Sequence, residues 1–300
     1  MPNTPDTMNL YIKNIAQLVT CQGTEAKHGR EAMGQIHTIE GPAAVVIRDG
    51  IITFAGRMAD VAPSMTEGCR ELDATGRCVL PGFVDSHTHL VFGGYREDEF
   101  QWRRAGDSYM SIMERGGGIA STMRATRAES EDELKASARR HLSNMMKMGV
   151  TTVEAKSGYG MNLETELKQL RVVRDLQDET GGFQTFIPFP FLPSHTELGR
   201  TVRQTSMWDD LRTIAISRLL LDNFRNIKAY WVMLTVPVAQ VALGFGANDI
   251  DGTVHKETIL HDAGAKSPRA LSEDHIIRII REIGRTPAAC DSNFNIIETY

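Results

Sequence analysis

The stretch that decides the fold is Val79 to Glu99, VLPGFVDSHTHLVFGGYREDE. Its apolar run, bounded by a proline-glycine pair and a glycine pair, is typical of a buried strand. His87 and His89 are two positions apart, so both imidazoles point to the same face of an extended strand. The stretch therefore predicts a strand that presents two nitrogen ligands on one side.

Two imidazoles on one face can hold one divalent ion, and nitrogen ligands suit zinc or iron(II). The remaining positions can take a carboxylate or a further histidine and a water that the metal makes nucleophilic. A lone HxH pair can also arise by chance. Here Asp85 and the form PGFVDSHTH give the pair a context that resembles the first barrel strand of the amidohydrolase superfamily. The pattern indicates a metal-dependent hydrolase.

The composition is that of an ordinary globular protein. The 300 residues are 41% hydrophobic and 24% charged, with a formal net charge of -5, which favours neither nucleic acid nor a membrane as a partner. The four cysteines are scattered without CxxC spacing, so they predict neither a zinc ribbon nor a disulfide scaffold. We expect a cytoplasmic protein without a signal segment or a membrane span, acting on a small molecule, with a homo-oligomer left open as its assembly.

Short strands dominate the first part of the chain, residues 1–78. Ala43 to Arg48 and Ile51 to Ala55 flank Asp49-Gly50, a dipeptide that favours a two-residue hairpin turn. Further strands are predicted at 8–19 and 69–72. The first part is expected to be a small β-sandwich-like domain.

From Val79 onward the pattern alternates between strand and helix, which predicts an α/β fold with parallel strands joined by helical crossovers. We count about five strand-helix units, whereas a complete barrel requires eight. Strands are predicted at 150–156, 183–191 and 227–232, and helices at 108–114, 129–148, 163–178, 208–221, after Pro237 and at 272–284. The glycine triplet Gly116 to Gly118 is expected to be a flexible loop over the site.

Residues 1 to about 170 resemble the imidazolonepropionases, amidohydrolases of histidine degradation that open an imidazolone ring to give N-formimidoyl-glutamate. The motifs that carry the resemblance are LPGFVDSHTHLVFGGYREDEF, ERGGGIASTMRATR from Glu114 and GVTTVEAKSGYG from Gly149. The resemblance implies that His87 and His89 are metal ligands, that Arg96 pairs with the propionate of the substrate and that Tyr159 contacts the imidazolone. Arg96 beside three acidic residues could equally form a surface ion pair, and Tyr159 could be an ordinary turn residue.

Residues from about 171 to 300 resemble the C-terminal part of aminofutalosine synthase, a radical S-adenosylmethionine enzyme of menaquinone biosynthesis. The motifs are DLQDETGGFQTFIPF from Asp175, ISRLLLDNFRNIKAYWVMLT from Ile216, AQVALGFGANDIDGTV from Ala239 and HDAGAKSPRALS from His261. That family needs CxxxCxxC to hold the iron-sulfur cluster that binds S-adenosylmethionine. The motif is absent from this sequence, so the resemblance implies no radical chemistry by this chain alone.

The chain is therefore similar to the front of one enzyme joined to the back of another, with the join inside the predicted helix 163–178. The later imidazolonepropionase motifs, which would complete the metal site, are missing. His195, Asp249 and Asp251 are the candidates in the second part that could replace them. Three interpretations remain open: an imidazolonepropionase-type hydrolase with an incomplete barrel and active site, an aminofutalosine-synthase-like protein, and a non-catalytic chimera.

Overall fold

The computed structural model describes the whole chain except residues 1–8, 22–29, 32–33, 196–197 and 255–256. The chain divides into two compact units. Unit one comprises 1–88 with 141–155, and unit two comprises 89–140 with 156–300. The predicted division at residues 78 and 170 stays a prediction.

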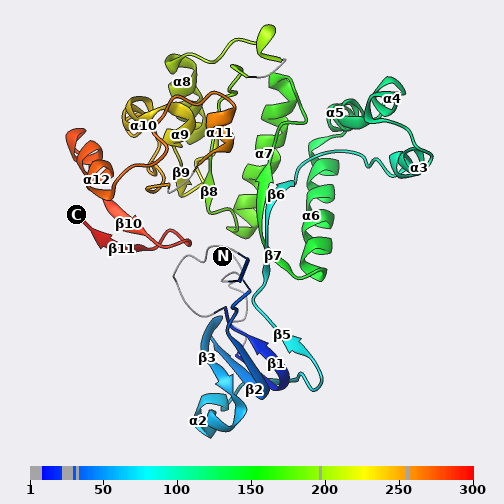
Figure 1. Ribbon diagram of the computed structural model, residues 1–300, viewed down its shortest axis with the longest axis vertical. Coiled ribbons are helices and arrows are strands. Elements are labelled where there is room, and N and C mark those ends of the chain that lie inside the picture. The colour runs from blue at the N-terminus through cyan, green and yellow to red at the C-terminus, as the bar shows by residue number, and fades with distance from the viewer. Residues whose placement is uncertain (1–8, 22–29, 32–33, 196–197, 255–256) are drawn as a thin grey trace. The chain divides into compact units, whose positions relative to one another are not determined.

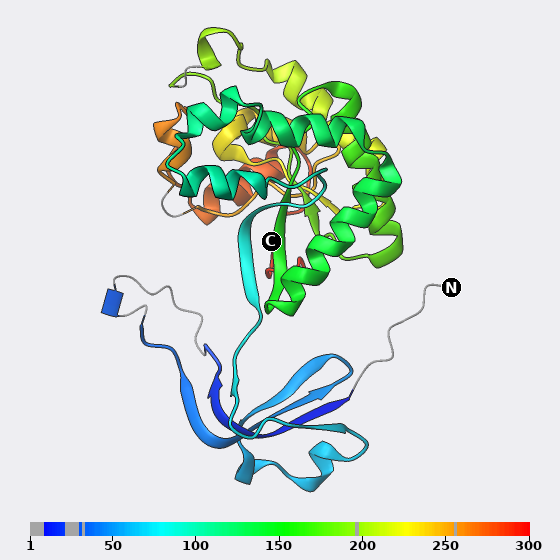
Figure 2. The same cartoon turned by 90° about the vertical axis from the view of Figure 1, so that its right-hand side faces the viewer.

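Unit one is built on a five-stranded sheet with the order β3-β2-β1-β4, in which β5 also pairs with β1 (Figure 2). Its strands are β1 (Leu10–Val19), β2 (Thr38–Arg48), β3 (Ile51–Arg57), β4 (Arg70–Asp73) and β5 (Cys78–Val79). The short helices η1 (Met58–Asp60) and α2 (Pro63–Thr66) connect β3 to β4. The strand predictions are confirmed, but the described residues 9–79 form one sheet, so the expected sandwich-like pair of sheets is wrong.

The hairpin between β2 and β3 turns at the predicted dipeptide. Asp49 and Gly50 have φ angles of 51° and 79°, as a primed two-residue turn requires. The inner face of the sheet is a small apolar cluster of Ile15, Leu18, Ala43, Val45 and Ala74. Unit one therefore has a core of its own.

The histidine-bearing strand is β6 (Phe83–His89), which pairs with β7 (Val150–Lys156) in a two-stranded sheet. The intervening α6 (Glu131–Lys147) begins at the predicted capping box, in which Ser130 and Glu133 exchange hydrogen bonds. The boundary between the two units cuts each of these three elements. Both strands and the helix confirm the predicted elements. The expectation that the histidine strand is buried is wrong, because no residue of β6 is buried and Phe83 and Val84 are more than half exposed.

Three short helices follow β6 in unit two: α3 (Asp98–Arg104), α4 (Tyr109–Glu114) and α5 (Gly118–Ala128). Ser108 caps α4 by accepting a hydrogen bond from the amide of Ser111. Helices α3 and α5 were not predicted. The expectation of a flexible glycine loop is wrong in part, because Gly118 is already the first residue of α5.

Helix α7 (Leu163–Thr180) spans the predicted join without a break. Asn162 caps its start by accepting from the amide of Thr165 at 2.8 Å. Gly181 ends it with a φ of 61°, a left-handed conformation that glycine adopts without a Cβ clash. The apolar spacing is continuous, so nothing in its local structure marks where the two resemblances meet.

The remaining elements of unit two carry short strands and many helices. In chain order they are β8 (Thr185–Phe186), η2 (Leu198–Arg200), α8 (Met207–Leu220), β9 (Asn226–Ile227), α9 (Trp231–Leu234), α10 (Val236–Ala242), α11 (Ile259–Asp262), α12 (Glu273–Glu282), β10 (Ala288–Cys290) and β11 (Ile296–Thr299). The predicted strands 183–191 and 227–232 are too long. Pro188 and Pro190 lack the amide donors that a strand needs, and the chain from Tyr230 turns into α9.

The second part of the chain has its own core. Ile214, Ile227, Trp231 and Leu234 are among its buried residues, all of which lie between positions 211 and 279. Figure 1 shows α8, α9 and α10 gathered beside β8 and β9, which pair in parallel. No buried member of this cluster comes from the imidazolonepropionase-like part.

The described residues form four sheets, of which the largest belongs to unit one and the other three have two strands each. None of these sheets closes on itself. The α/β class is confirmed, but a barrel is not present among the described strands. No helix in the described ranges has the length and apolar character that a bilayer span requires.

Candidate functional site

The two predicted metal ligands lie on β6, as the sequence indicated. His87 is exposed and His89 is half-buried. Asp85 lies on the same strand, and its Oδ1 accepts a hydrogen bond from the backbone amide of His87 at 3.1 Å. The strand thus presents the imidazole of His87 to solvent, while the carboxylate of Asp85 accepts a hydrogen bond from the backbone of the same strand.

A complete metal site does not occur among the described residues. Structural and catalytic zinc sites use three or four protein ligands, and the described part of the chain contains no group of three or more histidine, cysteine or acidic side chains placed to hold an ion. The predicted ligands His87 and His89 would supply two. The described residues therefore do not fit a resident metal ion.

Tyr159 lies just beyond β7 and stacks on His89. Their ring centroids are 4.2 Å apart with an interplanar angle of 30°. Phe92 meets Tyr159 edge-on, with centroids 5.8 Å apart. The structure thus brings together a predicted metal ligand and a predicted substrate contact, and an aromatic neighbour fixes the tyrosine ring.

Arg96 precedes α3, and its guanidinium lies near the side chain of Glu99. The Nε atom is 3.8 Å from Glu99 Oε1, and 35% of the arginine side chain is exposed. The contact is the local ion pair that the sequence left open as an alternative. It leaves part of the guanidinium accessible, so the predicted role toward a carboxylate stays a prediction.

Glu99 is the residue of this region that sequence reasoning missed. It is 5% exposed, although glutamate is rarely buried unless paired. Its Oε1 accepts a hydrogen bond from the amide of Gly118 at 2.6 Å, and its Oε2 lies 3.8 Å from Nη2 of Arg103. A weak signal was available, since Arg96 and Arg103 sit three residues before and four residues after it. Nothing in the sequence indicated its burial or its contact with the glycine triplet.

The candidate replacements in the second part are engaged elsewhere. Nδ1 of His195 lies 2.6 Å from the carbonyl oxygen of Asp262. Asp251 and Asp249 flank Lys228, whose Nζ is 2.8 Å from Asp251 Oδ1 and 3.5 Å from Asp249 Oδ2. These aspartates neutralise a half-buried lysine, so they are not available as an open ligand pair.

Lys228 keeps its charge in this setting. Burial alone would lower its pKa, but the pKa is raised because the charge and hydrogen bonds of Asp249 and Asp251 outweigh burial. The same surroundings, chiefly burial and then the charge of Asp251, raise the pKa of Tyr230. The cluster is a satisfied ion network of the second part.

A second polar network, of half-buried and buried side chains, surrounds His261. Its Nδ1 lies 3.0 Å from a carboxylate oxygen of Glu257, and its Nε2 lies 2.9 Å from the carbonyl of Ser267. Ser267 in turn donates from its hydroxyl to the carbonyl of Val232 at 2.7 Å. Both ring nitrogens face acceptors, so the imidazolium form is favoured. The hydrogen bond to Ser267 and the one to Glu257 accordingly raise the pKa of His261.

The first half of α7 contacts the imidazolonepropionase-like part. Lys168 donates from Nζ to backbone carbonyls at the end of α5, including that of Thr126 at 2.9 Å and that of Glu129 at 2.6 Å. The buried Gln169 donates to the carbonyl of Val91 at 2.6 Å. These contacts tie the helix to the segment that carries Arg96.

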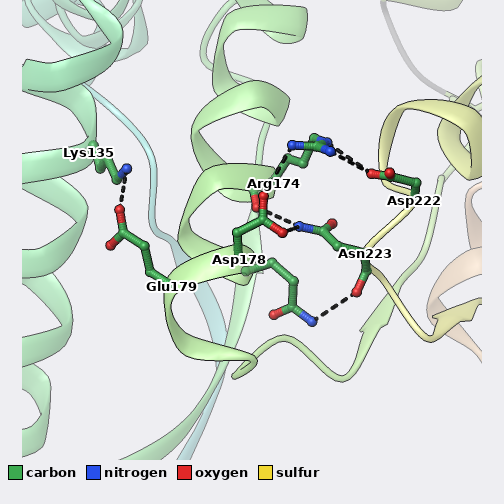
Figure 3. A network of polar contacts seen from close by, with 7 residues as sticks. Lys135, Arg174, Asp178, Glu179, Asp222 and Asn223 are labelled. Atoms are coloured by element: carbon green, nitrogen blue, oxygen red, sulfur yellow. Dashed lines mark hydrogen bonds and ion pairs between the residues drawn. The ribbon is translucent and has the colours of Figure 1, made fainter. Parts of the chain in front are cut away.

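The second half of α7 turns mainly to the other part (Figure 3). Arg174 lies between Asp178, at 3.2 Å, and Asp222, at 2.9 Å. Asn223 donates to Asp178 at 2.8 Å. The second half of the helix is thus held by residues of the loop that follows α8.

Glu179, near the end of α7, contacts a different helix. It forms ion pairs with Lys135 and Arg139 of α6. These are partly exposed pairs, which contribute little to stability. The charge contacts between α7 and α6 at this end are therefore weak.

Two family models match separate ranges of the chain. The model described as amidohydrolase family matches residues 70–128, and the model described as the CofH/MqnC C-terminal region matches residues 180–299. The second range begins at the last residue of α7. The two matches support the prediction that the chain joins two different sequences.

Curated relatives agree with the first match. An imidazolonepropionase of Porphyromonas gingivalis is 98% identical over 179 residues, which cover 60% of this chain and 42% of that protein. That of Clostridium tetani is 53% identical over 172 residues, or 57% of this chain and 41% of that protein. That of Phocaeicola vulgatus is 41% identical over 285 residues, or 90% of this chain and 66% of that protein. The chain spans less than half the length of the first two relatives.

Solved structures resemble the chain weakly. Guanine deaminase of E. coli has a TM-score of 0.44 at 11% identity, covering 94% of this chain and 67% of that one. An uncharacterized metal-dependent hydrolase from Pyrococcus furiosus has a TM-score of 0.39 at 12% identity, covering 92% and 76%. At these scores the likeness supports no inference.

Proposed function

We propose that this chain, in which sequence of the imidazolonepropionase type is joined to sequence of the CofH/MqnC C-terminal type, is an amidohydrolase with an incomplete active site. The reaction class is hydrolysis of a cyclic amide C–N bond. Imidazolone propionate, a small molecule, is the proposed substrate and a cytoplasmic histidine-degradation pathway the proposed setting.

The observation that carries the proposal is the near-identity of 179 residues with an imidazolonepropionase. It is supported by the stacked pair of His89 and Tyr159 and by the partly accessible guanidinium of Arg96. In the proposed roles, Tyr159 contacts the ring of the ligand and Arg96 holds its carboxylate by charge-assisted hydrogen bonds. His87 and His89 would contribute two nitrogens toward zinc or iron(II).

Incompleteness follows from the ligand count. Two imidazoles are half of a tetrahedral set, and the candidates in the second part are held by a lysine or by a backbone carbonyl. We therefore expect the isolated chain to bind a carboxylate-bearing imidazole, to hold zinc weakly and to turn over imidazolone propionate far more slowly than a complete imidazolonepropionase does.

The test measures zinc binding and turnover by the purified chain and by three alanine variants. His87→Ala and His89→Ala should each weaken zinc binding by about tenfold or more, equivalent to about 1.4 kcal/mol. His275→Ala, on α12, is the matched control and should leave zinc binding unchanged. Tight stoichiometric metal with turnover would show that the site is complete, and zinc binding that is indifferent to both β6 variants would remove the metal assignment.

The alternative reading starts from the second part, because its family model covers residues 180–299. Radical chemistry of the aminofutalosine synthase type would need an iron-sulfur cluster and S-adenosylmethionine, and the chain lacks the three-cysteine motif. This alternative predicts iron and sulfide in an anaerobic preparation. A non-catalytic chimera predicts neither activity nor ligand binding.

Sequencing the DNA across the codons for residues 160–185 separates a continuous gene from two joined ones. A continuous reading frame through α7 is expected for a true fusion. Two separate genes would show that the parts do not share a polypeptide.

A further inference from the structure

The side chain of Glu99 contacts three groups: the backbone amide of Gly118 and the guanidinium groups of Arg96 and Arg103. Its Oε1 accepts from the amide of Gly118 at 2.6 Å and lies 3.8 Å from Nε of Arg96. Its Oε2 lies 3.8 Å from Nη2 of Arg103. The carboxylate is 5% exposed, so it is held within unit two rather than in solvent.

The glycine triplet Gly116 to Gly118 approaches this carboxylate closely. A Cβ atom at Gly117 would lie 3.0 Å from Glu99 Oε1 and 2.8 Å from Cγ2 of Ile112, which is too close for most side chains. Gly118 has a φ of 64° and opens α5, an 11-residue helix. A negative charge at the start of a helix is stabilised by the unpaired amides there. The carboxylate of Glu99 therefore fills the anion position that the glycine triplet offers.

Arg96 is restrained from one side by the same carboxylate. Its Nε lies 3.8 Å from Glu99 Oε1, an ion-pair separation, while 35% of its side-chain surface stays exposed. A guanidinium presents its donors in a planar fork, so a restraint on Nε also limits the direction of the two terminal nitrogens. Arginine otherwise loses considerable rotamer freedom when it binds a ligand.

The geometry points to Glu99 as a positioning residue that holds Arg96 ready for the carboxylate of a small ligand. This inference rests on the proposed function, since it takes Arg96 as the group that meets that carboxylate. Glu99 does not touch the ligand. It acts by fixing the arginine and the first turn of α5 to each other.

The sign of the effect distinguishes positioning from simple charge. If Glu99 acted only as a negative neighbour, its removal would strengthen the attraction between Arg96 and an anion. If it positions Arg96, its removal weakens binding despite the gain in positive charge. Glu99→Gln is the informative change, because the amide oxygen can still accept from Gly118 while the charge is lost.

The experiment measures binding of two probes by titration calorimetry to the full chain. The probes are 3-(imidazol-4-yl)propionate and 4-ethylimidazole, which lacks the carboxylate. Glu99→Gln should bind the propionate about tenfold more weakly and the ethyl compound unchanged. Glu97→Gln, an equal change of charge at an exposed position in the same turn, should bind both probes as the wild type does.

Hydrogen exchange at Nε–H of Arg96, followed by NMR without ligand, gives a second readout. Exchange should be faster in Glu99→Gln than in the wild type and in Glu97→Gln. Equal or tighter binding of the propionate by Glu99→Gln would overturn the inference while the proposed function stands. A wild type that binds neither probe, with Arg96 exchange still dependent on Glu99, would overturn the proposed function and the ligand role of Arg96 together.

A second variant covers the case in which Glu99→Gln does not fold. Glu99→Asp keeps the charge but shortens the reach to Gly118 by one methylene. It should bind the propionate at least about threefold more weakly with no change for the ethyl compound. Unchanged propionate binding by a folded Glu99→Asp protein overturns the inference.

Discussion

Replacing Ile214 by alanine should unfold the second part of the chain more easily while leaving the sheet of unit one intact. Ile214 lies on α8 with 0% of its surface exposed, in a core whose buried members lie between positions 211 and 279. Removing a large aliphatic side chain from such a position costs about 2–5 kcal/mol, because the lost contacts leave a cavity. With a urea dependence of about 2 kcal/mol per molar, the midpoint should fall by roughly 1–2.5 M.

The assay uses the natural distribution of tryptophan. The three tryptophans, Trp102, Trp208 and Trp231, all lie in unit two, so their fluorescence reports that unit, whereas far-ultraviolet circular dichroism reports both. Ile216→Ala is the matched control, since the same change is made two positions away on α8 at a side chain that is 48% exposed. Its effect should stay within about 0.5 kcal/mol.

The converse variant lies in unit one. Ile15→Ala, in the separate core of the β1–β5 sheet, should lower the circular-dichroism transition of that sheet and leave the tryptophan midpoint unchanged. A tryptophan midpoint that falls equally in Ile15→Ala and Ile214→Ala would refute the reasoning, because it would mean that the two cores unfold as one.

Three further predictions concern single contacts. The pKa of His261 is raised, so the contribution of this histidine to stability is full below about pH 6.5 and is lost as pH rises through the folded-state pKa. The melting temperature should therefore fall between pH 6 and pH 8.5, and His261→Gln should remove that fall. Glu179→Gln, which breaks the ion pairs from α7 to α6, should cost less than about 1 kcal/mol and less still in high salt, as urea titrations at two ionic strengths will show. Gly117→Ala should cost about 1–3 kcal/mol in the tryptophan transition, because the new methyl group crowds Ile112 and then Glu99. Gly182→Ala meets its nearest atom at an ordinary 3.4 Å and should be near neutral.

The local signals in the sequence were sufficient for much of the secondary structure. The Asp49-Gly50 turn, the capping box at Ser130 and the existence of strand β6 each depend on neighbours within a few residues, and each was found as expected. Such features require no knowledge of the rest of the fold. The burial expected of β6 was not found, because burial depends on what packs against the strand. The strand expected at 227–232 was too long, because a short apolar run suits either a strand or a buried helix. The end of this run forms α9, which packs beside α10.

The join illustrates a limit of periodicity. Helix α7 keeps its apolar spacing and both of its caps across the predicted join, so its pattern contains no break. The motifs on either side and the two separate family matches are what indicate a join. The helix itself contacts both sides, since Lys168 and Gln169 bind the segment around α5 and Val91, whereas Arg174 binds Asp222.

The sequence by itself determined the pair His87 and His89 on one strand, the resemblance of each part and the absence of a cluster motif. Those facts depend on residue identity and short spacing. Only the tertiary structure decided that Glu99 is buried against Gly118, that Tyr159 stacks on His89 and that Asp249 and Asp251 are bound to Lys228. Contacts of this kind join residues far apart in the chain, so they depend on how the whole fold packs and not on short spacing. The strand therefore carries the two histidines of the proposed metal site, and the tertiary structure brings no third ligand to them among the described residues.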